Sequence, residues 1–94
     1  MNLDERIMIP LEGFLASLEQ RGYRPATVAV WRNSLRRFFE FVQSEGVFNA
    51  RNVPMELFFA FRGAISAQGL RDAVISRHEN RVIKFYIWLV NKER

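Results

Sequence analysis

The 94-residue chain contains no cysteine, one histidine and only two lysines. The absence of cysteine excludes disulfide bridges, thiolate zinc sites and cysteine nucleophiles. No apolar run approaches the roughly 20 residues that a membrane-spanning helix needs. The opening stretch, "MNLDERIMIP", carries acidic residues early and lacks the pattern of a secretory signal peptide. We therefore expect a soluble, cytoplasmic protein.

Patterns that would indicate catalysis or a bound cofactor are also scarce. The glycines are isolated from one another, so the sequence has no phosphate-cradling glycine-rich loop. His78 falls at the edge of a predicted buried stripe, and no second residue at metal-ligand spacing accompanies it. We interpret His78 as a hydrogen-bonded boundary residue rather than a metal ligand or general base. The sequence predicts no metal, no cofactor and no catalysis by these residues alone.

The residues that are present have the balance of one folded domain, which we expect to cover positions 1–94. Hydrophobic residues make up 49% and charged residues 26%, which excludes a disordered chain. Lys+Arg total 14 against 10 for Asp+Glu, so the net charge is +4. Nearly all of the positive charge is arginine, whose planar guanidinium suits bidentate contacts to phosphate and guanine. This charge suggests a polyanionic partner.

Apolar residues recur at spacings of three and four along the whole chain, which is the periodicity of amphipathic helices. Three predicted helices begin with proline, whose missing N–H costs nothing in a first turn. Glycine follows each of the first three, as expected for helix C-termini. The sequence therefore predicts an all-α fold with four helices and short loops. The predicted helices are Pro10–Arg21, Pro25–Ser44, Pro54–Ala67 and Asp72–Val90.

The chain also contains a weak internal repeat. When Gly22 is aligned with Gly69, "GYRPATVAVWRNSLRRFFEFV" lies on "GLRDAVISRHENRVIKFYIWL" without a gap. Asn33 then matches Asn80, and Phe38 matches Phe85. We expect two similar helical hairpins packed face to face around one aromatic core.

The second and fourth predicted helices carry matching faces opposite their apolar stripes. On a projection at 100° per residue, small residues lie near the start of each face, with asparagine and basic residues beyond. Small residues allow close approach of another surface, and asparagine and arginine are the side chains that read base edges bidentately. The alternative is an ordinary solvated helix face. The face of the second helix holds Ala26, Ala29, Asn33, Arg36, Arg37 and Glu40, and that of the fourth holds Ala73, Arg77, Asn80 and Lys84, with Ser76 and Arg81 at its edge.

Arg24 and Arg71 occupy the predicted N-cap positions of the same two helices, where Ser, Thr or Asp is preferred. A cation there is mildly unfavourable against the helix dipole, by about 0.3–1 kcal/mol. The placement is explained if phosphates approach these helix ends, which bind anions readily. The alternative is that both side chains extend into water. Phe41 and Trp88, at equivalent flanking positions of the two stripes, are candidates for packing against a further domain or partner.

With these features in place, the chain resembles the N-terminal core-binding domain of the tyrosine recombinase (phage integrase) family. The first half matches the pattern F-L-x-x-L-x-x-R-G from Phe14 to Gly22 and continues through Thr27, Leu35, Phe38 and Phe41. The second half matches through Gly69, Leu70, Ile75, Arg77, Phe85, Tyr86 and Leu89. The chain departs from the pattern at Val74, where Ser or Thr is frequent, and at Glu79, where an apolar residue is usual. These two departures affect the expected DNA contacts of the fourth helix.

The resemblance implies a SAM-like four-helix bundle that grips the major groove of a recombination half-site with its second and fourth helices. It also implies three partners: duplex DNA, a catalytic domain on the same parent chain, and other recombinase protomers. The setting would be the prokaryotic cytoplasm, at the nucleoid when DNA is bound. A different reading, left open by the residues, is a helical protein-interaction module with an arginine-rich face for an acidic partner. The expected base-contacting residues are Asn33, Arg77, Asn80 and Arg81, and the expected phosphate-contacting residues are Arg24, Thr27, Arg36, Arg37, Arg71 and Lys84.

Overall fold

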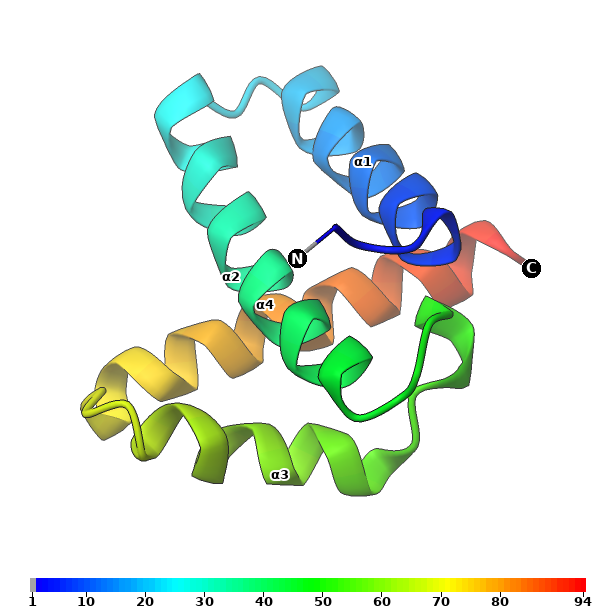
Figure 1. Cartoon of the computed structure of the whole chain (residues 1–94). Coiled ribbons are helices and arrows are strands. Elements are labelled where there is room, and N and C mark those ends of the chain that lie inside the picture. Colours follow the sequence, from blue (N-terminus) through cyan, green and yellow to red (C-terminus); the bar gives the residue numbers. More distant parts are fainter. Residues whose placement is uncertain (1) are drawn as a thin grey trace.

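The computed structural model describes residues 2–94 and contains two helical hairpins stacked crosswise (Figure 1). No strand occurs within this range, so the predicted all-α, four-helix fold is confirmed. None of the helices found in residues 2–94 combines the length and the apolar character needed to cross a membrane. The elements in chain order are α1 (Glu5–Gln20), α2 (Pro25–Ser44), the short 3₁₀ helix η1 (Ala50–Asn52), α3 (Met55–Ser66) and α4 (Asp72–Lys92).

The first helix starts at Glu5, so the prediction that it begins at Pro10 is wrong. Asp4 caps the helix by accepting a hydrogen bond from the backbone N–H two residues later. Ile7 is fully buried and extends the apolar stripe toward the N-terminus. Pro10 therefore lies inside α1, where it forfeits one intrahelical hydrogen bond. The cap and the added burial offset that loss.

The other predicted helix ends agree closely with the structure. Gly22, Gly46 and Gly69 have φ values of 86°, 88° and 88° and follow the ends of α1, α2 and α3. This left-handed conformation favours glycine, because a side chain there would meet the backbone. Pro25 opens α2 in its first turn as predicted, whereas Pro54 is the N-cap of α3 rather than its first helical residue.

The core is aromatic, and its contacts repeat between the two hairpins. Phe14 of α1 meets Phe85 of α4 edge-on, with ring centroids 5.6 Å apart. The residues that lie 47 positions away from this pair in the repeat, Phe61 of α3 and Phe38 of α2, make the same edge-on contact at 5.1 Å. All four rings are buried. The repeat seen in the sequence therefore corresponds to equivalent packing between the two hairpins.

Phe41 and Trp88 also make equivalent contacts, and these lie within the domain. Phe41 packs against Phe61 with ring centroids 5.9 Å apart, and Trp88 packs against Phe14 at 5.5 Å. Gly13 leaves room for the indole, since a Cβ at that position would lie 3.3 Å from it. Both rings are partly buried. The intradomain packing accounts for the apolar character of these flanking positions.

Candidate nucleic-acid interface

A buried polar junction lies where α2 and α4 are packed together. Ser34 of α2 is fully buried, the only buried polar or charged residue among positions 2–94. Its hydroxyl oxygen accepts a hydrogen bond from Nη1 of Arg81 at 2.9 Å and lies 2.7 Å from Nδ1 of His78. Because Ser34 already accepts from Arg81, its own hydroxyl hydrogen can be donated to Nδ1 of a neutral imidazole. The junction thus joins both helices through one hydroxyl group.

The surroundings of the junction keep His78 neutral. Burial lowers the pKa of His78 below its ordinary value of about 6.5, and the positive charges of Arg37 and Arg81 lower it further. The prediction that His78 is a hydrogen-bonded boundary residue is confirmed by its contact with Ser34. The same shift indicates that two guanidinium groups, one from each helix, lie close to this imidazole.

Two cations of α2 and α4, Arg37 and Lys84, each contact a neutral side chain on a neighbouring element. Nη1 of Arg37 in α2 donates to Oε1 of Gln68, just beyond α3, at 2.8 Å. Nζ of Lys84 in α4 lies 5.9 Å from the ring centroid of Trp31 in α2, a cation–π contact. Both contacts involve neutral groups. They position the cations without neutralising their charge.

Three residues on the outer side of the pair are exposed and have no side-chain hydrogen bond or ion pair to any other part of residues 2–94. They are Asn33, Arg77 and Asn80. Arg77 is flanked along α4 by Asn80 and Lys84 at the helical spacings of three and four, so these side chains share one surface. These residues form one surface with Arg37, Arg81 and Lys84, and we call this surface the basic seam. Its six side chains are Asn33 and Arg37 of α2 with Arg77, Asn80, Arg81 and Lys84 of α4.

Several arginines outside the seam form ion pairs. Four of these arginines pair with carboxylates: Arg6 with Asp4, Arg32 with Glu12, Arg51 with Glu93, and Arg62 with Asp72 and Glu79. No cation of the seam has a carboxylate within ion-pair distance in the described part of the chain. The seam therefore brings together four cations, Arg37, Arg77, Arg81 and Lys84, whose charges no carboxylate of the described residues neutralises.

The acidic residues of α4 all face away from the seam. Nη2 of Arg62 in α3 bonds Oε1 of Glu79 at 2.6 Å, and its Nη1 lies 3.6 Å from Asp72. Glu93 pairs with Arg51 at the other end of the helix. The side chain of Glu79 is only 16% exposed and is held against α3 by its ion pair with Arg62. Glu79 therefore does not oppose an anion at the seam.

Arg24 and Arg71 are the N-cap residues of α2 and α4, as predicted. Both have extended backbones and no side-chain capping bond, so their guanidinium groups and the first N–H groups of each helix face solvent. Thr27 is exposed in the first turn of α2. In Figure 1 the starts of the two helices lie on the same left-hand side of the molecule. The predicted anion-facing helix ends are thus both accessible.

Arg36 is the predicted site residue that has a carboxylate partner. Its Nη1 lies 3.9 Å from Sδ of Met8 in α1, and its Nη2 is 4.0 Å from Glu40. Consecutive residues of a helix point about 100° apart, so Arg36 and Arg37 occupy opposite edges of the exposed face of α2. Arg36 lines a hollow between α2 and α3 together with the seam residues Asn33 and Arg37. Arg36 therefore borders the basic seam, and it differs from the cations of the seam in its ion pair with Glu40.

Sequence reasoning missed Ser34 and Gln68 as partners of the basic residues. Ser34 could have been noticed, because it is a polar residue on the apolar stripe between Trp31 and Phe38. It also corresponds to Arg81 in the internal repeat, 47 positions later. Gln68 carries no comparable signal, since it lies in a polar turn.

Other chemistry is sparse in residues 2–94. No group of three or more His, Cys, Asp or Glu side chains is placed to hold a metal ion there. The Tyr86 hydroxyl donates to the carbonyl oxygen of Ala50 at 2.7 Å, and burial raises the pKa of Tyr86.

Comparisons of the chain with protein-family models, with curated proteins and with solved structures found no match.

Proposed function

We propose that this chain is a duplex-DNA-binding module that holds a recombination half-site, as the core-binding domain of a tyrosine recombinase does. The proposal rests on one observation: none of the cations of the basic seam has a carboxylate partner, whereas Arg6, Arg32, Arg51 and Arg62 form ion pairs. A cation without an internal partner can neutralise a phosphate and release its counterion. The cleavage and strand-transfer chemistry would belong to a catalytic domain of the parent protein.

The arrangement of the seam favours DNA over a flexible acidic chain. Arg77, Asn80 and Asn33 are exposed on helices whose backbones are held together by the Ser34 junction. Asparagine pairs bidentately with adenine and arginine with guanine, and such pairing needs a rigid platform. Arg24 and Arg71 at the helix starts, with Arg37 and Lys84 beside the seam, would contact phosphates on either side.

Fluorescence anisotropy with a labelled duplex of the parent recombination site tests the proposal. With about five phosphate contacts, we expect affinity to fall roughly 10²- to 10³-fold between 50 and 200 mM salt. Arg77→Ala and Arg37→Ala should each weaken binding about tenfold, and each should reduce the salt slope by about one. Arg32→Ala is the matched control, because it removes the same charge from α2 at a residue that pairs with Glu12. Its affinity should change less than about twofold.

Two results would overturn the proposal. If Arg32→Ala weakened binding as much as Arg37→Ala, binding would depend on net charge alone and not on the seam. If poly-L-glutamate of matched charge bound as tightly as the duplex at the same salt, the acidic-partner alternative would be favoured. Amide NMR shifts recorded during both titrations locate the contact, which we expect on α2 and α4 for the duplex.

A further inference from the structure

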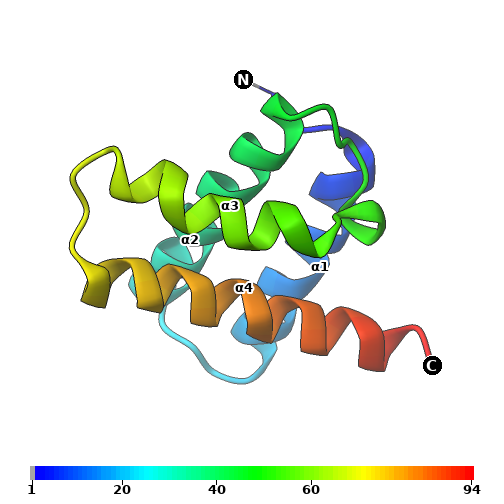
Figure 2. The ribbon, with the colours of Figure 1, turned by 90° about the horizontal axis from the view of Figure 1, so that it is seen from below.

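Arg81 is the cation of the basic seam that is bonded to a buried group beneath it. Its Nη1 donates to the hydroxyl oxygen of Ser34 at 2.9 Å, at a position with no access to water. Figure 2 shows α2 crossing behind both helices of the α3–α4 hairpin, and this bond joins α2 to α4. The N–H that bonds Ser34 is not free to donate to a phosphate or a base edge. The Arg81 side chain is therefore only partly available to a ligand at the seam.

The neutral imidazole of His78 completes this arrangement. Its Nδ1 lies 2.7 Å from the Ser34 hydroxyl oxygen. Because that oxygen accepts from Arg81, the hydroxyl hydrogen goes to Nδ1, and the proton of the neutral ring is assigned to Nε2. Every group at the junction then has a partner, and no buried side-chain polar atom in residues 2–94 lacks one. The arrangement depends on Nδ1 being an acceptor.

Protonation of His78 removes that acceptor. An imidazolium carries a hydrogen on each nitrogen, so Nδ1 becomes a second donor to the oxygen that Arg81 already bonds. The Ser34 hydrogen loses its partner, and two positive charges meet at one buried hydroxyl group, where weak screening strengthens their repulsion. The Arg81 side chain is long and partly exposed, whereas the imidazole is attached close to the backbone. Arg81 is therefore the group that leaves.

The other charges around His78 do not offset this repulsion. Arg37 of α2 and Arg81 of α4 are the charged groups that act on the imidazole, and both are positive. No carboxylate in residues 2–94 lies within ion-pair distance of the ring. Beyond α3, the neutral Gln68 bonds Arg37, and Arg62 of α3 is paired with acidic residues of α4. From α1, no charge acts on the ring. A charged imidazole thus has no favourable partner at the junction.

We propose that Ser34 and His78 form a pH-dependent switch that positions Arg81. When the imidazole is neutral, Arg81 is held at the Ser34 hydroxyl, and when it is protonated, Arg81 is released into the basic seam. The consequence for a ligand rests on the proposed function, because the released guanidinium and the new charge on His78 both favour a phosphate at the seam. Duplex binding should therefore be stronger at low pH, and by linkage it should be accompanied by proton uptake.

NMR of the arginine side chains in the free protein tests the switch without DNA. A hydrogen bond from Nη1 restricts rotation about the Cζ–Nη1 bond, so we expect restricted rotation for Arg81 at pH 7.5 and free rotation at pH 5. The change should follow the titration of the His78 ring protons. Arg62 is the internal control, because its bonds to Ser76 and Glu79 do not involve His78.

Two variants separate the two parts of the switch. His78→Gln retains a neutral acceptor for the Ser34 hydroxyl and cannot be protonated, so Arg81 should stay restricted at both pH values. Ser34→Ala removes the acceptor for Arg81, which should then rotate freely at both. Far-ultraviolet circular dichroism establishes that each variant retains its helices. If Arg81 of the unsubstituted protein rotates equally at both pH values while His78 titrates, the switch is overturned.

Fluorescence anisotropy with the labelled duplex at constant salt measures the consequence for binding. We expect the unsubstituted protein to bind about three- to tenfold more tightly at pH 5 than at pH 7.5, roughly the effect of one added phosphate contact. His78→Gln should lose most of this difference, and an equal pH dependence in that variant would overturn the link between the switch and the seam. Release of Arg81 without duplex binding at either pH would overturn the proposed function and leave the switch intact.

Discussion

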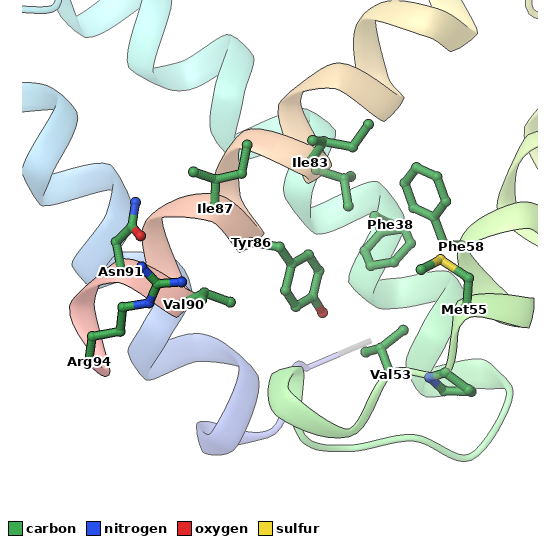
Figure 3. Close-up of a pocket in the computed structure, with 12 residues that line it drawn as sticks. Phe38, Val53, Met55, Phe58, Ile83, Tyr86, Ile87, Val90, Asn91 and Arg94 are labelled. Atoms are coloured by element: carbon green, nitrogen blue, oxygen red, sulfur yellow. The ribbon is translucent and has the colours of Figure 1, made fainter.

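Helix α4 has two surfaces of opposite character. Its side toward α2 carries Arg77, Arg81 and Lys84, which have neutral partners or none. Its side toward the start of α3 carries Ile83, Ile87 and Val90, which line an apolar groove of about 670 Å³ between α3 and α4 and lack full apolar cover (Figure 3). The first surface has cations without carboxylate partners, and the second has apolar side chains without full apolar contacts. The comparison shows that one helix of this fold has two surfaces that the rest of the chain leaves unsatisfied for different physical reasons.

The two surfaces share a single core. Phe38 lies beneath the apolar groove and also packs against Phe61 and Phe39 in the aromatic cluster. Phe85 occupies the equivalent position and packs against Phe14. The difference between seam and groove is therefore confined to the outer layer of side chains, over a core that supports both.

The largest expected effect comes from removing that common support. Phe38→Ala should destabilise the fold by about 3–5 kcal/mol, because a fully buried ring is lost and a cavity remains. This is a large share of the roughly 5–15 kcal/mol that stabilises a typical domain. Urea denaturation followed by circular dichroism measures it. A loss below about 1 kcal/mol would mean that seam and groove do not depend on one core.

An intermediate effect should come from the junction beneath the seam alone. Ser34→Ala removes the hydroxyl that accepts a hydrogen bond from Arg81 and contacts His78, at a position with no access to water. We expect a loss of about 1–3 kcal/mol, the cost of leaving buried polar groups without partners. Urea denaturation gives the free energy of unfolding. Retention of full stability would show that the junction does not join the helices.

The smallest expected effect is the change in stability when His78 becomes protonated. Because burial, Arg37 and Arg81 lower the folded pKa of His78, the unfolded state binds more protons in the window just below pH 6.5. The contribution of His78 to the free energy of unfolding is fully present above about pH 6.5. It is lost as the pH falls through the pKa of His78 in the unfolded state and then through its pKa in the folded state. Urea denaturation at pH 5 and pH 7.5, with His78→Gln as the control, measures the difference.

The same imidazole reports on the seam. Phosphates placed beside Arg37 and Arg81 would offset their repulsion and raise the pKa of His78 toward its ordinary value. NMR titration of the His78 ring with and without duplex DNA should therefore show an upward shift on binding. A pKa that stays the same in the complex would place the DNA elsewhere on the molecule and break the assignment of the seam.

Much of the fold could be predicted from local patterns. The spacing of Val28, Leu35 and Val42 placed α2, and the glycines at 22, 46 and 69 placed the helix ends, because periodicity and positive φ are properties of short stretches. The start of α1 was missed because Pro10 is a strong local signal for a first turn. The cap by Asp4 and the burial of Ile7 outweighed it, and that burial depends on residues far along the chain.

The candidate site was predicted less completely. The shared face of Arg77, Asn80 and Lys84 followed from helical spacing, and so did the exposure of Asn33. Arg36 lines the same hollow as Arg37, but its ion pair with Glu40 and its contact with Met8 were not predicted. The η1 turn and the groove between α3 and α4 were not predicted, since no local pattern specifies how far two helices diverge.

The sequence by itself determined the four helices, their repeat and the basic face of α4, because these depend on side-chain spacing over a few turns. Only the tertiary structure decided which cations are neutralised. Arg62 and Glu79 are separated by 17 residues, Arg32 and Glu12 by 20, and Arg51 and Glu93 by 42. The interaction between a cation and a carboxylate depends on the distance between them in space, and that distance is set by how the helices pack. The cations of the seam therefore became distinct from these paired arginines only in the folded chain.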